Sequence, residues 1–287
     1  AAEDWLASGC ALAVNLGDTV DRRGGSDAPA ALARVLEAFE AFGPVLHLPG
    51  NHDLSSLSAA EVAPLDPRRD LLGGMDADEG PGCCCCCDIR VGVGWRLILL
   101  DTYAVAVRRD AAAARALLER LTGEARARGR GVPAHLREHE ELNGAVGDAQ
   151  LEWLAQRLQS ARASRERVVV LAHAALEAKT TVYGDAVCWD CDRVCAVLNR
   201  FPEVVAAVIT GHSHHFGEAV SDAGIYHRVL EAAMEGDVGV PTHAILELEG
   251  DTLRLVGRGA VRGWERTFPP MKGGDAPVES GQKSAIS

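Results

Sequence analysis

The stretch VVAAVITGHSHH (residues 204–215) decides the fold class of this chain. Residues 204–210 are apolar or β-branched throughout, which predicts a buried β-strand. The five residues that follow, GHSHH (211–215), hold three of the chain's 10 histidines within four positions. Each imidazole has two ring nitrogens that need a partner, and a metal ion is a common partner for one of them. On its own, the stretch is compatible with a metal site at a strand end or with a polar, solvated loop.

Three other predicted strands also end in Asp, Asn or His. They are CALAVNL followed by GDTVD (10–21), VLHL followed by PGNHD (45–53), and RVVVLA followed by His173 (167–173). In open α/β sheets, ligands bind just beyond the carboxyl ends of the strands. GNHD alone could be a simple turn, and a single strand-end histidine is more often a core residue with its own hydrogen bonds. Four such strand ends in one chain predict a binding site where they meet.

The remaining predicted elements alternate with these strands. They are helices that begin near Asp27, cover 110–130, begin at Asp148 and cover 187–200, a strand at 95–101 and a hairpin at 242–259. This alternation predicts a layered α/β domain with mixed sheets. From about residue 262, Gly, Pro, Ser and Lys dominate, so we expect one domain over residues 1–262 and a disordered tail over residues 263–287.

Composition narrows the class of protein and its partners. Of the 287 residues, 47% are apolar and 24% are charged, and the formal net charge is -12. This acidic balance disfavours nucleic acid and anionic lipid, and no apolar stretch reaches the ~18 residues of a membrane span. Five of the nine cysteines are consecutive, which does not fit a disulfide framework. We therefore expect a cytoplasmic monomer that binds neither nucleic acid nor membrane and acts on a small molecule.

The order of the strand-end motifs, GD-x-x-D, GNHD, a strand-end His and GH-x-H, resembles the calcineurin-like metallophosphoesterases. Further segments are similar to the manganese-dependent ADP-ribose/CDP-alcohol diphosphatases of that superfamily. They are AAEDW (1–5), WRLILLDTY (95–103), NGAVGDAQLEWLAQRL (143–158), YHRVLEA (226–232) and LRLVGRG (253–259). The resemblance runs from residue 1 to about residue 262. It implies an α/β fold in which two mixed β-sheets pack together between helices, and a hydrolase that cleaves the pyrophosphate of ADP-ribose and CDP-alcohols.

The resemblance also implies which residues bind metal. Asp18 would bridge two divalent ions, with Mn²⁺ the expected metal. Asn51, His173 and His212 would complete the shell of one ion, and His214 would bind the other. Carboxylate, amide oxygen and imidazole are ligands that suit Mn²⁺.

The catalytic roles follow from the same resemblance. A metal-bound hydroxide would attack one phosphorus of a nucleotide substrate, and His52 would be the general acid beside the leaving phosphate. Asp21 and Asp53 would orient the groups around it. The alternatives are a phosphomonoesterase, a cyclic-nucleotide phosphodiesterase, or a one-metal remnant that acts as a scaffold.

Two parts of the sequence depart from the family pattern. A first strand ending in Asp-x-His or Asp-x-Gln would add ligands to the ion that His214 binds, whereas residues 1–7 match the helix after that strand. We therefore expect the first strand to be lacking and the second metal site to be incomplete. CCCCCDIR (83–90) stands where the family has a strand with aromatic and polar residues. Successive strand residues point to opposite faces, which favours a strand over a thiolate metal site.

The other cysteines and the substrate contacts carry weaker signals. Cys188, Cys191 and Cys195 have C-x2-C-x3-C spacing, but the last two are one-turn neighbours on a helix, which favours a structural role over a metal site. The candidate substrate contacts are three aromatic residues that could stack on a nucleobase and an amide that could meet a phosphate, with packing as the alternative: Tyr103, Trp189, Phe216 and Asn143.

Overall fold

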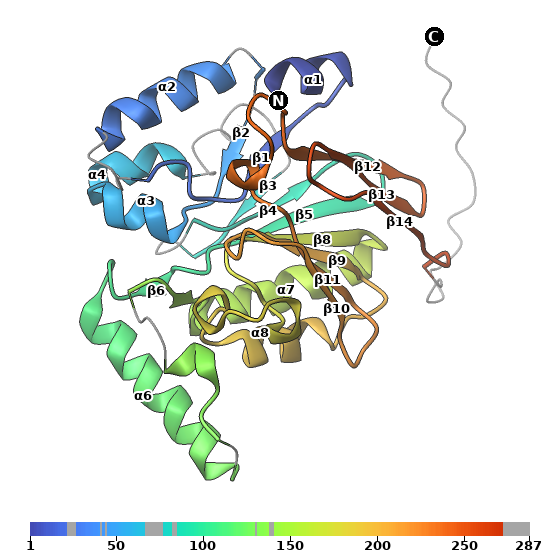
Figure 1. Cartoon of the computed structure of the whole chain (residues 1–287). Helices are drawn as coiled ribbons and strands as arrows, with labels where there is room; N and C mark the ends of the chain where they lie inside the picture. Colours follow the sequence, from blue (N-terminus) through green and yellow to red (C-terminus); the bar gives the residue numbers. More distant parts are fainter. Residues whose placement is uncertain are drawn as a thin grey trace.

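The computed structural model describes residues 1–21, 27–40, 42–43, 45–66, 77–81, 85–129, 131–137 and 141–271 (Figure 1). The strands are β1 (Ala13–Asn15), β2 (Val45–His47), β3 (Ala77–Glu79), β4 (Cys87–Arg90), β5 (Trp95–Leu100), β6 (Val105–Ala106), β7 (Gly144–Ala145), β8 (Arg167–Ala172), β9 (Val205–Thr210), β10 (Gly217–Val220), β11 (Tyr226–Val229), β12 (His243–Glu249), β13 (Thr252–Arg258) and β14 (Trp264–Thr267). The α-helices are α1 (Ala2–Ala7), α2 (Ala28–Glu40), α3 (Asn51–Ser56), α4 (Ala59–Val62), α6 (Ala111–Ala127), α7 (Asp148–Ser164) and α8 (Cys191–Leu198). Short 3-10 turns are η1 (Ala63–Leu65), η2 (Ala134–Leu136), η3 (Ala178–Thr180), η4 (Gly184–Ala186) and η5 (Ala233–Glu235).

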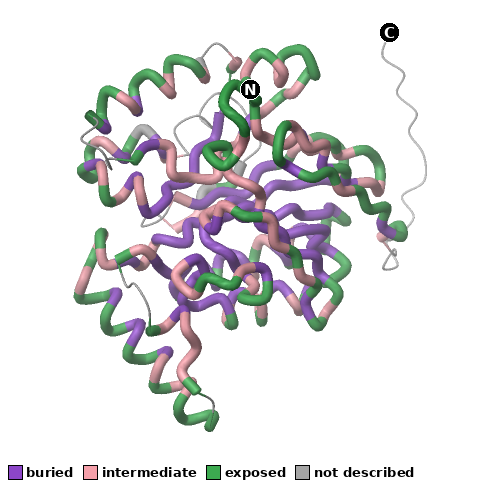
Figure 2. The backbone as a smooth tube through the Cα atoms, in the orientation of Figure 1, coloured by how far each residue is buried: buried purple, intermediate pink, exposed green. Residues whose placement is uncertain are grey.

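Seven strands form the central sheet, in the order β10-β11-β9-β8-β5-β4-β3. β11, β9, β8 and β5 run parallel, whereas β10, β4 and β3 are antiparallel to their neighbours. β8 and β9 are buried at every position, which explains their uninterrupted apolar sequences (Figure 2). Because β8 and β9 are parallel neighbours, the polar residues that follow them reach the same edge of the sheet.

A second layer of strands covers one face of the central sheet. β1 and β2 pair in parallel, while β12, β13 and β14 form a separate antiparallel sheet. Leu46 and Leu48 from the first unit and Leu253 from the second share one core with Leu97 and Leu99 of the central sheet. The expected two-layer arrangement is therefore present, but the described strands of the second layer form two hydrogen-bonded units instead of one mixed sheet.

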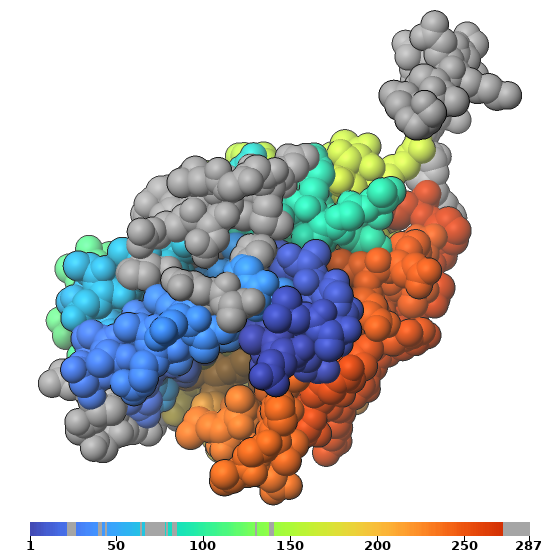
Figure 3. Space-filling view, turned by 90° about the horizontal axis from the view of Figure 1, so that it is seen from above, coloured from blue at the N-terminus to red at the C-terminus, as the bar shows by residue number. Residues whose placement is uncertain are grey.

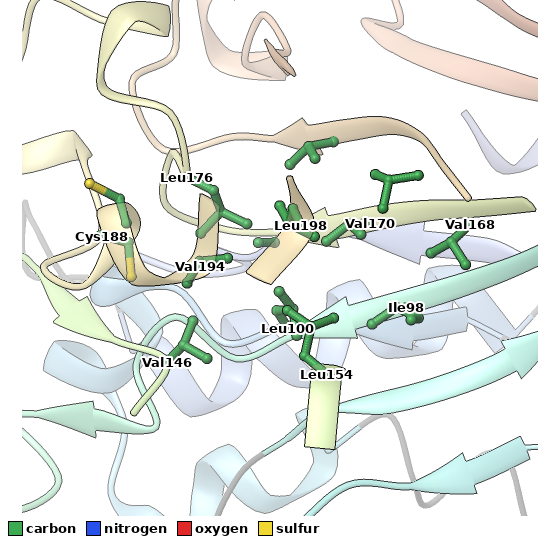
Figure 4. Packing of buried hydrophobic residues seen from close by; sticks show 14 of the residues in the cluster. Ile98, Leu100, Val146, Leu154, Val168, Val170, Leu176, Cys188, Val194 and Leu198 are labelled. Atoms are coloured by element: carbon green, nitrogen blue, oxygen red, sulfur yellow. The ribbon is translucent and has the colours of Figure 1, made fainter. Parts of the chain in front are cut away.

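Helices α7 and α8 cover the other face of the central sheet (Figure 1). In this core, Leu154 of α7 and Leu198 of α8 lie close to Leu100 and Val170 of the sheet (Figure 4). On the opposite side of the molecule, α2 lies over the second layer, where the ring of Phe39 contacts the ring of His47. The layers are thus helix, small sheets, large sheet and helix.

Helix α1 forms hydrogen bonds with the hairpin of β12 and β13. The carboxylate of Asp4 accepts hydrogen bonds from His243 Nε2 at 2.9 Å and from Arg258 Nε at 3.1 Å. The ring of Trp5 stacks on Phe39 with 5.8 Å between centroids. Figure 3 shows the dark-blue N-terminal segment directly against the orange hairpin. Segments almost the full chain length apart are therefore in direct contact.

The last described strand lies beyond the expected end of the domain. The composition predicted a disordered tail over 263–287, but residues 264–267 form β14, in which Trp264 stacks on Tyr226 with 4.3 Å between centroids. This aromatic contact and the pairing with β13 explain the additional strand. The rest of the tail, from residue 272 on, lies outside the described residues. Among the described helices, none combines the length and apolar character that a membrane crossing requires.

Candidate metal centre

Three side chains from the two layers converge at the carboxyl ends of the strands. Asp18 follows β1 in the second layer, while His173 follows β8 and His212 follows β9 in the central sheet. One ligand atom from each of these residues lies within 4.8 Å of the other two. Across the described ranges, this is the only group of three or more His, Cys, Asp or Glu side chains with ligand atoms this close. Three of the four strand ends named by the sequence therefore meet at one point.

The atoms that face this point lack hydrogen-bond partners. Asp18 Oδ2, Asn51 Oδ1 and His173 Nε2 are all buried without a hydrogen bond, although Asp18 Oδ2 and His173 Nε2 lie 3.3 Å from each other. A buried polar atom without a partner costs about 1–3 kcal/mol. Asn51 reaches the site because α3 begins directly after the strand β2. Two oxygens and an imidazole nitrogen that lack partners are the donor set a divalent cation would satisfy, so the residues fit a metal ion.

Hydrogen bonds to backbone carbonyls set the tautomers of the two histidines. His173 Nδ1 donates to Leu16 O at 2.7 Å, and this leaves Nε2 with its lone pair toward Asp18. His212 Nε2 donates to Asp185 O at 2.9 Å, and this leaves Nδ1 as the ligand atom. A neutral imidazole held by its second nitrogen is the usual form of a metal-binding histidine.

The pKa values of the three groups depend on one another. Burial raises the pKa of Asp18, but His173 and His212 outweigh it and hold that pKa well below its usual range. Burial and the neighbouring His173 lower the pKa of His212 to about 3, so its ring is neutral at pH 7. Burial also disfavours the charged form of His173, but the attraction of Asp18 is stronger and raises the pKa of His173. A metal ion therefore competes with a proton at His173.

Several residues of the centre have a left-handed backbone conformation. Four non-glycine residues of the described chain have positive φ, and three of them are Asp18 (54°), His212 (65°) and His214 (63°). This left-handed conformation costs a non-glycine residue roughly 1 kcal/mol or more and is concentrated at functional sites. Gly17 and Gly50 have no room for a side chain, because a Cβ would overlap His173 at the first and Asp18 at the second. The GD and GN dipeptides are therefore steric requirements of the site.

His52 lies beside the ligands, and its ring faces a carboxylate of its own. Its backbone N–H donates to Asp18 Oδ1 at 2.9 Å, and its Nδ1 lies 3.3 Å from Asp21 Oδ1. Asp53 is fully buried and accepts hydrogen bonds from the N–H groups of Gly50 and Val20. Asp21 thus orients the ring of His52, and Asp53 orients the two loops. The proposed acid and its two supporting carboxylates occupy positions that suit these roles.

His214 faces a carboxylate that the sequence motifs do not include. Its Nδ1 lies 3.1 Å from Glu235 Oε1 of η5, and its backbone carbonyl accepts a hydrogen bond from Ala232 N. This contact leaves Nε2 of His214 as the available ligand atom. His214 is not part of the cluster of Asp18, His173 and His212, and its assignment to a second ion stays a prediction.

Other groups of the protein surround the side chains of the four residues predicted to contact the substrate. Tyr103, Trp189 and Asn143 are at most 2% exposed, and Asn143 donates to the carbonyl of Val187. The ring of Phe216 has the guanidinium groups of two arginines over it, at 5.0 and 4.4 Å from its centroid. Tyr103 lies beneath the metal ligands, with its ring 5.8 Å from that of His173. These contacts favour packing roles for all four residues.

The cysteine run does not converge on a point. Cys86 is part of the core under α7 and α8, whereas Cys87 belongs to the core under the second layer. The Sγ atom of Cys85 lies 3.9 Å from Arg109 Nη2. Cys83 and Cys84 lie outside the described residues. Where it is described, the run therefore follows the strand-like alternation that the sequence favoured, although only Cys87 belongs to β4.

The three cysteines near α8 also have separate partners. Cys188 Sγ donates to Asp190, Cys195 Sγ donates to the carbonyl of Leu176, and Cys191 Sγ lies 3.7 Å from His135 Nε2. Burial raises the pKa of Cys188 and of Cys191 well above the usual value. Thiols that stay protonated and point apart are consistent with the structural role.

Three contributors to the site could not be found from sequence motifs. The carbonyl groups of Leu16 and Asp185 orient two histidines, and Glu235 faces the third. A backbone carbonyl carries no residue-type signal. Glu235 lies in a short 3-10 turn, 21 residues after its partner, where no periodic pattern marks it.

The layered fold is shared with a solved dimetal phosphatase, and the sequence is similar to curated diphosphatases. No protein-family model matches the chain. Curated proteins named manganese-dependent ADP-ribose/CDP-alcohol diphosphatase match it from Oryza sativa subsp. japonica (31% identical over 268 residues, 90% of this chain and 80% of the relative) and from Arabidopsis thaliana (30% over 269 residues, 90% and 82%). The crystal structure of a dimetal phosphatase from Danio rerio aligns with a TM-score of 0.73 at 23% identity, covering 93% of this chain and 87% of that one. The chain belongs to the manganese-dependent ADP-ribose/CDP-alcohol diphosphatase family.

Proposed function

We propose that this protein uses divalent metal ions, Mn²⁺ foremost, to hydrolyse the pyrophosphate bond of ADP-ribose and CDP-alcohols. The observation that carries the proposal is the convergence of Asp18, His173 and His212 at the junction of the two layers, with buried atoms of Asp18, Asn51 and His173 that have no hydrogen bond. The names of the plant relatives supply the substrate class.

The chain would hold one ion with Asp18, Asn51, His173 and His212, and a second with Asp18 and His214. When bound, such ions neutralise the charge of a reacting phosphate and lower the pKa of water. The positive-φ loops keep the ligands in place before any ion arrives, so little reorganisation is needed on binding.

His52 is the proton donor of this proposal. Its ring is 17% exposed, so it can reach a bound substrate, and Asp21 holds the ring from the other side. Nδ1 faces Asp21, which leaves Nε2 to donate a proton to the departing phosphate oxygen.

The test is hydrolysis of ADP-ribose, CDP-choline, cyclic AMP and an aryl phosphate with Mn²⁺, for the wild type and for Asp18→Asn. We expect cleavage of the first two substrates, and loss of both activity and bound Mn²⁺ in the variant. Asp4→Asn, which alters a carboxylate remote from the metal centre, is the matched control and should retain both.

Two results would contradict the proposal. Normal turnover by Asp18→Asn would remove the metal centre from the reaction. Cleavage of cyclic AMP or the aryl phosphate in preference to both diphosphates would assign the site to another class of phosphoesterase.

The cellular setting is part of the proposal. We place the protein in the cytoplasm as a monomer without nucleic-acid or membrane partners. The net charge of -12 supports the lack of nucleic acid. Cys10, Cys85, Cys188, Cys191 and Cys195 are free thiols, which fits a reducing compartment.

A further inference from the structure

One aromatic side chain of this protein is exposed. The chain has five Trp, three Tyr and five Phe residues, and all of them lie in the described ranges. Twelve are buried or half-buried, whereas Tyr183 is 47% exposed. Its neighbour Val182 is 92% exposed. Tyr183 is therefore the one Trp, Tyr or Phe side chain in the described ranges whose ring is open to a ligand from solvent.

The segment that carries Tyr183 borders the metal centre. Two residues after it, the carbonyl of Asp185 accepts the hydrogen bond from His212 Nε2. On the other side, the carbonyl of Thr180 is so close to Gly217 that no Cβ would fit there. Tyr183 N also donates to Thr181 Oγ1 at 3.1 Å. The backbone around the ring is therefore fixed to the metal-binding loop, although the ring itself is exposed.

The ring of Tyr183 lies next to the histidine that directly follows the metal ligand His214. The centroids of Tyr183 and His215 are 6.1 Å apart, and their planes are tilted by 42°. His215 is itself exposed. Two exposed rings thus stand together at the rim of the centre, one from each of two loops that meet there.

We propose that Tyr183, with His215 at its edge, forms the surface on which the nucleobase of the substrate stacks. This inference rests on the proposed function. The other aromatic residues near the site, Tyr103, Trp189 and Phe216, are buried or covered, so they offer no open ring face. Stacking requires only the flat face of a base and is tolerant of its identity. Such a surface explains how one site takes both an adenine and a cytosine nucleotide.

Two products of the proposed reaction provide a matched pair of ligands. AMP and ribose 5-phosphate both carry a ribose phosphate, but only AMP has a base. Calorimetric titration of the Mn²⁺-loaded protein should show that Tyr183→Ala weakens AMP and CMP binding by about 5- to 100-fold, the range found for loss of base stacking. Binding of ribose 5-phosphate should stay unchanged. Tyr183→Phe keeps the ring and should restore AMP binding.

Val182→Ala is the control for disturbance of the loop, because it removes an exposed side chain beside the ring. It should leave AMP binding unchanged. In turnover, Tyr183→Ala should raise KM for ADP-ribose and CDP-choline by the same factor and leave kcat nearly constant.

The inference is overturned if Tyr183→Ala binds AMP as tightly as the wild type, or if it loses AMP and ribose 5-phosphate equally. Its failure is distinct from failure of the proposed function. If the wild type hydrolyses ADP-ribose and Tyr183→Ala binds AMP like the wild type, only the stacking surface is refuted. A wild type that needs Tyr183 to bind AMP but hydrolyses no diphosphate refutes the activity and supports the surface.

Discussion

Among the single residues of the centre, His52 has a proposed task, proton donation, that can be separated from metal binding. Its backbone N–H holds Asp18, whereas its ring faces Asp21. His52→Ala keeps the backbone contact and removes the proton donor, so kcat should fall by ~10²–10⁴-fold while bound Mn²⁺ stays constant. Steady-state kinetics together with elemental analysis measure both quantities.

The control for this prediction is His243→Ala. His243 also pairs with a carboxylate, Asp4 at 2.9 Å, but it lies at the hairpin and away from the ligands. Its replacement should leave kcat unchanged. Loss of a metal equivalent in His52→Ala would make His52 a ligand and contradict the assignment.

Residue types and positions were largely predictable at this scale. Asp18, His173 and His212 could be located because strand ends concentrate ligands, and the structure brings them within 4.8 Å. The tautomers could not be predicted, since they depend on the carbonyl groups of Leu16 and Asp185, which approach only after folding.

At the scale of elements, β4 offers a test of the cysteine run. Cys86 and Cys87 are both 0% exposed, and they belong to the two different cores. Serine buries a hydroxyl at each position, which costs about 1–3 kcal/mol when no partner is available. Cys86→Ser and Cys87→Ser should each lower the free energy of unfolding by this amount, measured in urea, with bound Mn²⁺ unchanged. Cys10→Ser, at a half-buried position, is the control and should cost less.

A metal equivalent lost in either variant would contradict this prediction and indicate a thiolate site. An unchanged free energy of unfolding would show that the neighbouring groups satisfy the new hydroxyl.

The long elements of the fold and the short apolar strands β1 and β2 could be predicted from sequence, whereas the short polar strand β14 could not. β8 and β9 are uninterrupted apolar runs, and α7 begins at Asp148 as expected. β14 was missed because residues 264–267 are mostly polar and exposed. Its order comes from the stacking of Trp264 on Tyr226, a contact between residues far apart in the chain.

At the scale of the whole molecule, buried histidines set the response to acid. His227 of β11 is 2% exposed, neither ring nitrogen has a hydrogen-bond partner, and burial lowers its pKa from 6.5 to about 4. Between these values the unfolded chain binds a proton at this position that the folded chain does not. Stability is therefore full above pH ~6.5 and falls as the pH drops toward ~4, by roughly 3 kcal/mol for this residue.

His227→Leu should reduce this loss. Urea unfolding near neutral pH and near pH ~4 should differ less in the variant than in the wild type by up to roughly 3 kcal/mol. His47→Leu is the comparison variant. Burial also lowers the pKa of His47 to about 4, but the ring of His47, unlike that of His227, has a polar neighbour, Asn15, at 3.4 Å. An identical pH dependence in wild type and His227→Leu would show that the folded chain accommodates the charged ring.

The arrangement of layers was predictable only in part. The strand–helix alternation and the family resemblance anticipated two packed layers of strands. The second layer is divided into β1–β2 and β12–β14 because these two groups do not exchange hydrogen bonds. Strand register and sheet twist determine this pairing, and both depend on segments far apart in the chain.

The contacts of Asp4 with His243 and Arg258 have a consequence for biosynthesis. The first of these pairs is separated by 239 residues and the second by 254. A ribosome that adds about 5–20 residues per second needs tens of seconds to make the hairpin after α1 has emerged. Throughout that time, Trp5 and the acidic first turn of α1 have no hairpin to dock on. The contacts of Asp4 with the hairpin are therefore among the last to form, and until the hairpin is made this carboxylate has neither of these two partners.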